Sequence, residues 1–372
     1  MSNLSSYIKN LPGFRTSKKL IVIESDDWGS NRMPSLESFN ILRAKGITND
    51  SIRYDKYDTL ANDKDLSELF DVLHSVKDKN GSPAKITAVA VVANPDFRRI
   101  EASGFKEYQY ELFIDTLNRR GESNVINLWK QGINSGYFVP EYHGREHLNI
   151  ARWMKALQRG HEATCIAFQN GVYGITFKTP QKQEDSYLAA YDYFEPSEID
   201  QLKEITIDGL NQFEKVFGFR SSYFVPPNGP LSSHLHDTLL KSGIRVIQTA
   251  RFIYSEPVGY GKMMKRIRYF GMKNNAGQIY TLRNAFFEPN DNPQIDWVTK
   301  CMGEIETVFS YYKPAIISSH RVNFIGALHP ENRERSLKLL KQLLLQITLK
   351  WPDVEFMTSG ELTNLILKES IK

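Results

Sequence analysis

Residues 20–30 constrain the fold of this chain more than any other stretch. They read Leu-Ile-Val-Ile-Glu-Ser-Asp-Asp-Trp-Gly-Ser, so four apolar residues run directly into acidic side chains and a glycine. A short apolar run of this kind predicts a buried strand, and Gly29 lets the chain turn where that strand ends. In α/β folds the carboxyl ends of parallel strands converge on one crevice, and chemistry is placed there. We therefore expect functional carboxylates at the end of this strand.

Asp26 and Asp27 are adjacent, and this spacing assigns them different tasks. Successive side chains of a strand point to opposite faces, so two neighbouring carboxylates cannot do the same job. We expect one of them to face a ligand directly and the other to reach it from the flank. An acidic pair at a strand end is also common as a turn or a helix cap, which is the structural alternative.

Composition and charge exclude several classes of protein. The 372 residues are 41% hydrophobic and 12% aromatic, enough to bury a large core in one barrel or in two modest domains. Basic and acidic side chains number 47 and 43, and no basic block resembles a nucleic-acid arm, so we expect no nucleic-acid partner. Cys165 and Cys301 lie far apart, which predicts neither a disulfide framework nor a zinc knuckle and is typical of a reducing compartment.

The sequence shows neither a leader nor a membrane span. Residues 1–19 space Leu4, Ile8 and Leu11 among polar residues, without the continuous apolar core of a signal peptide. No stretch approaches the ~20 apolar residues that cross a bilayer. We therefore expect a cytoplasmic protein, and the sequence leaves its oligomeric state open.

Strands followed by amphipathic helices recur along the whole chain. Expected strands after the first are residues 86–92, 137–141, 219–225, 245–249, 314–320 and 354–357. About seven strand-then-helix units favour a closed barrel over an open sheet. We predict an α/β fold, an irregular (β/α)7 TIM-like barrel with loop insertions, as a single catalytic domain over residues 1–372. Residues 95–135 mix aromatic and charged side chains and are expected to form an inserted or elaborated region.

Histidines at two further strand ends complete a metal-binding pattern. His143 and His147 follow the strand at 137–141, and His320 ends the strand at 314–320. A hydrolytic metal site needs about three protein ligands and an open position, and imidazole with carboxylate suits zinc and its neighbours. Histidines four apart share one side of a helix, so we expect one helical turn to align the first two rings. A single histidine such as His320 is more often structural.

The ordered motifs resemble the polysaccharide deacetylases of the NodB-homology type, carbohydrate esterase family four. That family ends its first strand in Phe-Asp-Asp-x-Gly, and residues 25–29 read Ser-Asp-Asp-Trp-Gly. Its His-x-x-x-His motif is matched by residues 143–147, and its Arg-Pro-Pro-x-Gly-like loop by Val225-Pro226-Pro227-Asn228-Gly229. Its late Leu-x-His strand end is matched in position by Ser318-Ser319-His320, and residues 354–362 resemble the end of family barrels.

The resemblance implies a mechanism and a set of site residues. Asp27, His143 and His147 would hold a divalent metal, with zinc expected and Co, Mn, Ni or Fe as further metals that fit. Asp26 would act as general base and His320 as the acid that protonates the leaving group. A backbone N–H in residues 227–229 would help to stabilise the oxyanion. Candidate contacts to an acetylated saccharide are Trp28, Arg32, Tyr142, Pro227 and Asn228.

Two features depart from the family pattern. The arginine with which the family holds its base is Val225 here, so Arg220 or Arg283 must take that role, or the role is vacant. Asp27 and His143 are 116 positions apart, which implies an insertion between the first two motifs.

The leading hypothesis is a metal-dependent deacetylase of an N- or O-acetylated sugar or polysaccharide precursor, and three alternatives stay open. One is a metal-independent glycoside hydrolase that uses Glu24, Asp26 or Asp27 as one of its two carboxylates. Another is a catalytically silent glycan-binding relative. The third is an iron oxygenase with two histidines and one carboxylate, which usually has a different fold.

Overall fold

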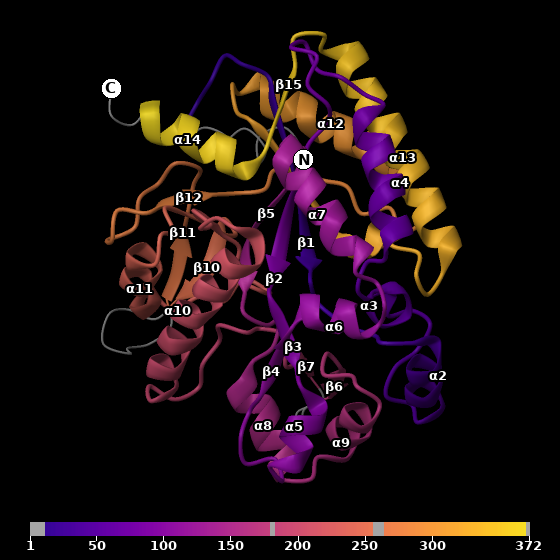
Figure 1. The fold of residues 1–372 in the computed structure, drawn as a ribbon. Helices are drawn as coiled ribbons and strands as arrows, with labels where there is room; N and C mark the ends of the chain where they lie inside the picture. The colour runs from indigo at the N-terminus through magenta and orange to yellow at the C-terminus, as the bar shows by residue number, and fades with distance from the viewer. Residues whose placement is uncertain (1–11, 179–182, 256–263, 370–372) are drawn as a thin grey trace.

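Parallel strands form a ring of seven positions in the computed structural model, which describes residues 12–178, 183–255 and 264–369 (Figure 1). Ladders join neighbours in the order β12, β9, β8, β5, β2, β1, β14 and β13. The ring consists of β1 (Leu20–Trp28), β2 (Ile86–Val91), β5 (Phe138–Gly144), β8 (Tyr223–Phe224), β9 (Val246–Gln248), β12 (Ile279–Thr281), β13 (Ala285–Phe286) and β14 (Ala315–His320). A further strand, β15 (Glu355–Met357), pairs with the first residues of β1.

One segment, residues 279–286, closes this ring. Its first part, β12, pairs with β9, and its last part, β13, pairs with β14. Both ladders are parallel, so the segment runs in one direction and changes partner at residues 282–284. β12 and β13 therefore share the seventh position of the barrel, and we call residues 282–284 the seam. This arrangement confirms the α/β class and the irregular (β/α)7 barrel predicted from the sequence.

Alternation along β1 separates the barrel interior from the layer beneath the helices. Leu20 and Val22 belong to an interior cluster with residues from several other strands, whereas Ile21 and Ile23 pack in the main core. Leu362 of α14 (Ser359–Glu369) joins the interior cluster, and Figure 1 shows this helix at the amino-terminal ends of the strands. Since the amino-terminal mouth is covered, a site has to open at the carboxyl ends.

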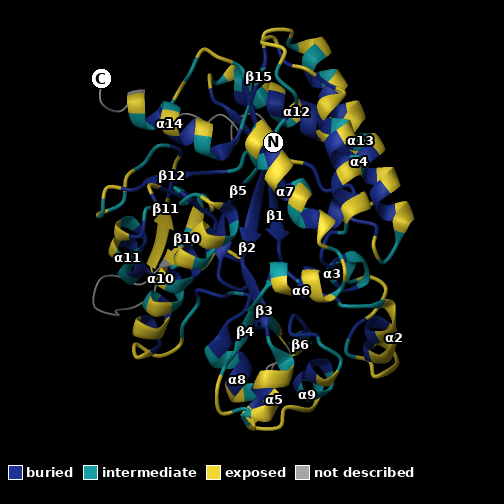
Figure 2. Ribbon diagram, viewed as in Figure 1, coloured by how far each residue is buried: buried dark blue, intermediate teal, exposed yellow. Residues whose placement is uncertain are grey.

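Helices surround the strands and bury the outer face of the barrel. They are α4 (Asp63–His74), α7 (Asn124–Ser135), α10 (Glu198–Phe217), α11 (His236–Lys241), α12 (Trp297–Ser310) and α13 (Pro330–Lys350), with the short η1 (Ser233–Leu235) before α11. In Figure 2 their exposed residues lie outward, while the strands between them are buried. The antiparallel hairpin of β10 (Phe252–Ser255) and β11 (Met264–Ile267) follows β9.

Segments beyond the carboxyl ends of the strands build a lobe with its own apolar core. The lobe core includes Phe39 of one helix and Trp153 and Phe168 of two consecutive helices more than a hundred positions further along the chain. Figure 1 shows α5, α8 and α9 grouped below the ends of β1 and β2. Elements on this side are α2 (Leu36–Ala44), α3 (Arg53–Tyr57), α5 (Phe97–Ala102), α6 (Phe113–Arg119), α8 (Ile150–Gln158), α9 (Glu162–Gln169), β3 (Ala93–Pro95), β4 (Tyr110–Leu112), β6 (Thr176–Lys178), β7 (Glu184–Ser186) and η2 (Arg321–Asn323).

The region expected to be elaborated, residues 95–135, divides between the two parts of the molecule. Its first half contributes α5 and β4 to the lobe, whereas α7 packs against β5 and α4 of the barrel. Among the described residues no helix combines the length and apolarity needed to span a bilayer. The expectation for the amino terminus concerns residues 1–11, which lie outside the described part of the chain.

Candidate metal centre

Two β-bulges shape the carboxyl ends of the strands that carry the predicted ligands. The β1–β2 ladder gains one residue of β1 between Ser25 and Trp28, and the β2–β5 ladder gains one of β5 at His143. Asp27 also has a left-handed backbone, with φ at 74°. Bulges and positive φ values interrupt strict alternation and re-aim side chains, and both are common next to active sites. The backbone thus turns Asp27 and His143 toward the same point.

His143 is oriented by a backbone carbonyl. Its Nδ1 lies 2.7 Å from the carbonyl oxygen of Val225. A carbonyl can only accept a hydrogen bond, so Nδ1 donates and the neutral ring keeps its lone pair on Nε2. That Nε2 is buried without a hydrogen-bond partner, 3.5 Å from Asp27 Oδ1. His143 Nε2 and Asp27 Oδ1, which are both hydrogen-bond acceptors, therefore face each other in the protein interior.

His147 approaches the same carboxylate oxygen from a loop. Its Nε2 lies 3.2 Å from Asp27 Oδ1. The expectation that one helical turn aligns His143 and His147 is wrong, because the first is in β5 and the second precedes α8, which begins only at Ile150. The turn at Gly144, with φ at 129°, brings the chain back toward the strand end instead.

The three side chains fit a divalent cation. One donor atom from each of Asp27, His143 and His147 lies within 4.8 Å of the others, and all three residues are buried. Burial alone would raise the pKa of the Asp27 carboxyl, but the adjacent imidazoles of His143 and His147 hold that pKa well below its usual value. Burial lowers the pKa of His147, which favours the neutral ring that a metal needs. One carboxylate with two imidazoles suits zinc and its neighbours.

Asp26 lies inside the barrel beside the metal ligands, and Arg283 from the seam holds it. Arg283 Nη1 donates to Oδ2 at 2.6 Å, and Nη2 donates to Oδ1 at 2.5 Å. Its Nε donates to the fully buried Glu24 at 2.7 Å. Burial would raise the pKa of the Asp26 carboxyl, but Arg283 outweighs it and keeps the pKa below the usual value. Asp26 is therefore ionised and fixed in orientation.

The structure distinguishes between the two arginines considered from the sequence. Arg220 donates to Glu214, Asn211 and the carbonyl of Ser242, so it is occupied elsewhere. Arg283 holds the acidic strand end in place of the residue that the motif would put at position 225. Val225 contributes its carbonyl to His143 instead.

His320 faces Asp26 from the end of β14. Its Nε2 lies 3.9 Å from Asp26 Oδ2, and its Nδ1 lies 2.5 Å from Glu288 Oε1. Burial opposes the charged ring, but Glu288 and the nearby aspartates raise the pKa of His320 to about 9. Arg53 and Asn323 both donate to the other Glu288 oxygen at 2.9 Å. His320 is thus a protonated group held by a fixed carboxylate.

Sequence reasoning missed Glu288, although a signal for it exists. It follows Ala285, Phe286 and Phe287, an apolar run that ends in an acidic residue just as residues 20–27 do. The run is too short to read as a strand without its neighbours, because β13 is the second half of a divided strand.

The predicted saccharide contacts have different surroundings. Trp28 and Tyr142 are 1% and 0% exposed and pack against core aromatics, so they are corrected to core residues that present no surface to a sugar. Pro227 is buried beside Gly144, and Asn228 is exposed with φ at 55°. Arg32 lies at the edge of the metal centre.

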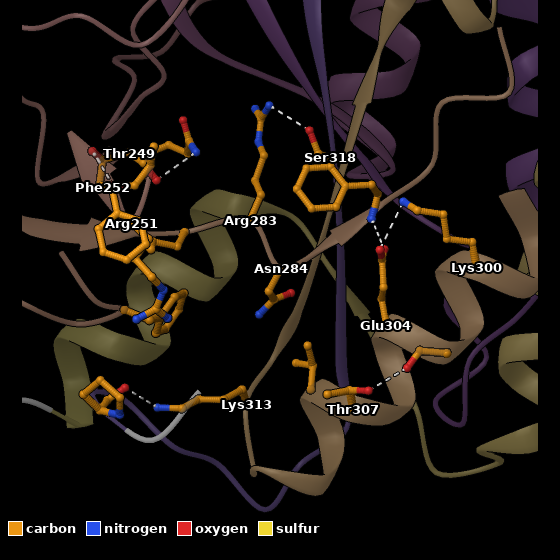
Figure 3. A pocket seen from close by; sticks show the side chains of 18 residues that line it. Thr249, Arg251, Phe252, Arg283, Asn284, Lys300, Glu304, Thr307, Lys313 and Ser318 are labelled. Carbon is orange, nitrogen blue, oxygen red and sulfur yellow. Dashed lines mark hydrogen bonds and ion pairs between the residues drawn. The ribbon is translucent and has the colours of Figure 1, made fainter. Parts of the chain in front are cut away.

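A cavity of about 770 Å³ lies behind this centre, at the seam (Figure 3). Arg283, Asn284 and Ser318 line it, and Arg283 donates to Ser318 as the figure shows. Asp27, His143 and His147 are not among its lining residues. The Arg283 side chain therefore separates the cavity from Asp26 at the end of β1.

Comparisons with known proteins gave matches to solved structures only. No family model and no curated protein matches the chain. A probable polysaccharide deacetylase from Pseudomonas aeruginosa PAO1 is similar over 94% of this chain and 91% of its own, with 10% identity and a TM-score of 0.48. A family 4 acetyl xylan esterase from Clostridium thermocellum, in complex with a cobalt ion, covers 93% and 91%, with 14% identity and a TM-score of 0.37.

A 4-alpha-glucanotransferase from Thermococcus litoralis is also similar, over 92% of this chain, with 10% identity and a TM-score of 0.46. This chain spans 40% of the length of that enzyme. Because one fold hosts many chemistries, the function has to be argued from the site itself.

Proposed function

We propose that this chain is a metal-dependent hydrolase that removes acetyl groups from an N- or O-acetylated sugar or polysaccharide precursor. The observation that carries the proposal is the buried approach of His143 Nε2 and His147 Nε2 to Asp27 Oδ1, at 3.5 and 3.2 Å. A buried carboxylate that faces the lone pair of one imidazole and the ring nitrogen of a second is stabilised by a cation between them. Zinc is the expected metal, and Co, Mn, Ni or Fe also fit the donor set.

The residues around the ligands supply acid–base chemistry. A divalent metal at these ligands would polarise the acyl carbonyl and activate water near neutral pH. Asp26, ionised and fixed by Arg283, accepts the proton of the attacking water. His320, protonated and held by Glu288, gives a proton to the leaving amine or alkoxide. These two groups are on different strand ends, so they can act on opposite sides of the scissile bond.

The loop after β8 offers a donor for the oxyanion. Pro226 and Pro227 have no N–H, and the N–H of Gly229 donates to the carbonyl of Pro226 at 3.0 Å. The N–H of Asn228 makes no hydrogen bond to a described residue. We assign the oxyanion contact to this N–H, which adds to the stabilisation by the metal.

The acyl-transfer chemistry is inferred from these contacts. The sugar as substrate is inferred from the resemblance of the ordered motifs to those of the deacetylase family. Cys165 and Cys301 are free thiols, which is in keeping with a cytoplasmic substrate such as a glycan precursor. A glycoside hydrolase needs two available carboxylates. Glu24 is fully buried and paired with Arg283, and Asp27 faces the two imidazoles, so of the three carboxylates considered only Asp26 is left for that chemistry.

Metal analysis combined with acetate release tests this function. The purified protein is expected to contain about one zinc per chain and to release acetate from a panel of N- and O-acetylated saccharides. Chelation should abolish release, and added zinc or cobalt should restore it. Asp26→Asn should keep the metal and lose the rate, whereas Asp27→Asn should lose both.

Three results would contradict the proposal. Glycan cleavage that survives chelation would point to the glycoside hydrolase. Oxygen consumption would indicate the iron oxygenase. Saccharide binding with no acetate release from the metal-loaded protein would leave a silent binding relative.

A further inference from the structure

Arg32 has a buried guanidinium with few partners beside the metal centre. The residue is 8% exposed, and its Nε is buried without a hydrogen-bond partner. The nearest carboxylate oxygen is Asp55 Oδ1, at 3.9 Å from Nε, beyond hydrogen-bond distance. The other Asp55 oxygen accepts from Thr48 at 2.6 Å. Within the described part of the chain, the Arg32 guanidinium makes no hydrogen bond.

Tyr54 connects Arg32 to the catalytic groups. The Arg32 guanidinium carbon lies 4.7 Å from the centroid of the Tyr54 ring. The same ring meets His320 edge-on, with centroids 5.7 Å apart. Arg32 also lies close enough to His147 to disfavour a positive charge on that ring. Arg32 and His320 therefore contact the same ring, and the charge of Arg32 acts on the metal ligand His147.

Three neighbouring arginines on this side of the barrel have hydrogen-bond acceptors for their guanidinium groups. Arg53 donates to Glu288 at 2.9 Å and to the Tyr54 hydroxyl at 3.0 Å. Arg321 donates twice to Asp58 and once to the carbonyl of Ser30. Arg283 holds Glu24 and Asp26. Arg32 differs from all three, because its ion pair with Asp55 is too long for a hydrogen bond and its guanidinium makes none to a described residue.

A guanidinium presents five N–H donors in a fixed plane. Burying such a group without acceptors is costly, so an unsatisfied one indicates a missing partner. Its two-pronged edge matches carboxylate and phosphate oxygens, which it binds in preference to neutral groups. The missing partner of Arg32 is therefore an anion that arrives in the same crevice as the acyl group.

We infer that the substrate carries a carboxylate or phosphate that Arg32 binds, so that the substrate class is an acidic acetylated sugar. This inference rests on the proposed function and adds the charge of the substrate to it. The Tyr54 ring, which contacts the guanidinium groups of Arg32 and Arg53 and meets His320 edge-on, holds Arg32 near the proton donor. Arg32 acts as a specificity-determining residue, because it discriminates between charged and neutral saccharides.

Three probes that differ only at C6 test the inference: N-acetylglucosamine, its 6-phosphate and its 6-carboxylate, the uronic acid. With the zinc-loaded protein, kcat/KM for at least one anionic probe should exceed that for the neutral sugar by about 10- to 100-fold. The preferred anion tells a phosphate substrate from a carboxylate one. The preference should decline as salt is added.

Arg32→Gln should reduce kcat/KM for the preferred anionic probe by about 10- to 100-fold more than for the neutral sugar. The change should lie mainly in KM, because the contact is made equally before and during reaction. Arg32→Lys should recover part of the preference, since it keeps the charge but loses the two-pronged edge. Arg43→Gln is the matched control, because Arg43 is exposed and paired with Asp50. It should change no rate.

Binding is measured separately from turnover, by calorimetric titration of the three probes into zinc-loaded Asp26→Asn and Asp26→Asn/Arg32→Gln proteins. The inference requires tighter binding of an anionic probe that the second variant loses. Equal affinity and equal kcat/KM for neutral and anionic probes would overturn it and leave the deacetylase intact. Equal loss of all rates in Arg32→Gln would show a structural role instead. Anion-selective binding without acetate release by the parent protein would keep this inference and overturn the proposed function.

Discussion

Arg283 and Asp26, 257 positions apart in the chain, form a two-pronged ion pair inside the barrel. The pair exists because residues 279–286 change partner from β9 to β14 at the seam. Where neither ladder is complete, the side chain of residue 283 points inward and reaches the end of β1. The change of strand partner at the seam therefore places the Arg283 guanidinium where it orients Asp26, the candidate base.

Replacement of Arg283 by Lys should lower kcat by about 100-fold and leave the metal content unchanged. Lysine keeps the charge but cannot hold both oxygens of Asp26, so the base loses its orientation. Steady-state kinetics with metal analysis on the same preparation check this. A rate close to that of the parent protein would show that Arg283 does not position Asp26.

Arg283→Met should in addition destabilise the fold. It leaves Glu24 and Asp26 buried without their partner, and breaking a buried ion pair costs about 3–5 kcal/mol. Urea unfolding followed by circular dichroism measures the loss. Arg220→Met is the control, since that side chain is partly exposed and away from the acidic strand end. An equal loss of unfolding free energy in both variants would show that the buried ion pairs of Arg283 stabilise the fold no more than the exposed contacts of Arg220 do.

The pH–rate profile should reveal the pair formed by His320 and Glu288. His320 must be protonated to act as the acid, and its pKa is raised to about 9. The rate should therefore fall as the pH rises through about 9. Glu288→Gln removes the carboxylate that favours the charged ring, so the basic limb should move to lower pH. A basic limb at the same pH in Glu288→Gln and in the parent protein would show that Glu288 does not favour the charged form of His320.

The same pair links stability to pH in a defined direction. A folded pKa above the unfolded value of about 6.5 stabilises the fold while the ring is charged. This contribution is complete below about pH 6.5 and is lost as the pH rises through about 9. Thermal unfolding of the parent protein and of Glu288→Gln across that range measures it. The difference in melting temperature between them should shrink toward high pH.

Much of the barrel could be predicted from local patterns. The apolar run at residues 20–23 with its acidic end predicted β1, and the strand expected at residues 314–320 matches β14. Apolar strands and amphipathic helices alternate over most of the chain, which is enough to predict seven units. These patterns are readable because burial is decided by neighbours in sequence.

The site contains relationships that no local pattern predicts. The helical alignment of His143 and His147 was wrong because a bulge and the turn at Gly144 re-aim the first ring. Trp28 looked accessible beside the acidic pair, but the bulge in β1 returns it to the core. The position of Glu288 at a strand end depends on residues 279–286, a strand segment that is divided between two ladders. Each of these depends on contacts between residues far apart in the chain.

Removal of the metal should lower the melting temperature. A metal that binds Asp27, His143 and His147 in the folded protein stabilises the folded state by mass action. At a free metal concentration a hundred times Kd the gain is about 2.7 kcal/mol. Thermal unfolding before and after chelation, and after addition of zinc, checks this.

Two histidine variants serve as controls for the metal effect. His147→Gln should melt at the same temperature with and without chelator, because it has lost a ligand. His161→Gln should respond as the parent protein does, since His161 is an exposed residue at the start of α9. A parent protein whose melting is indifferent to chelator and zinc would remove the basis for the metal centre.

Asn284 should stabilise the seam in its own right, because its side chain replaces missing ladder hydrogen bonds. Its Oδ1 accepts from the N–H of Ile316 at 2.8 Å, and its Nδ2 donates to the carbonyl of Pro314 at 2.9 Å. Asn284→Leu leaves both backbone groups without a partner, which should cost about 1–3 kcal/mol of unfolding free energy. Asn118→Leu, at an exposed position of α6, should change it by less than about 0.5 kcal/mol. Urea unfolding of the two variants compares them directly, and equal stabilities would mean that the seam closes without the amide.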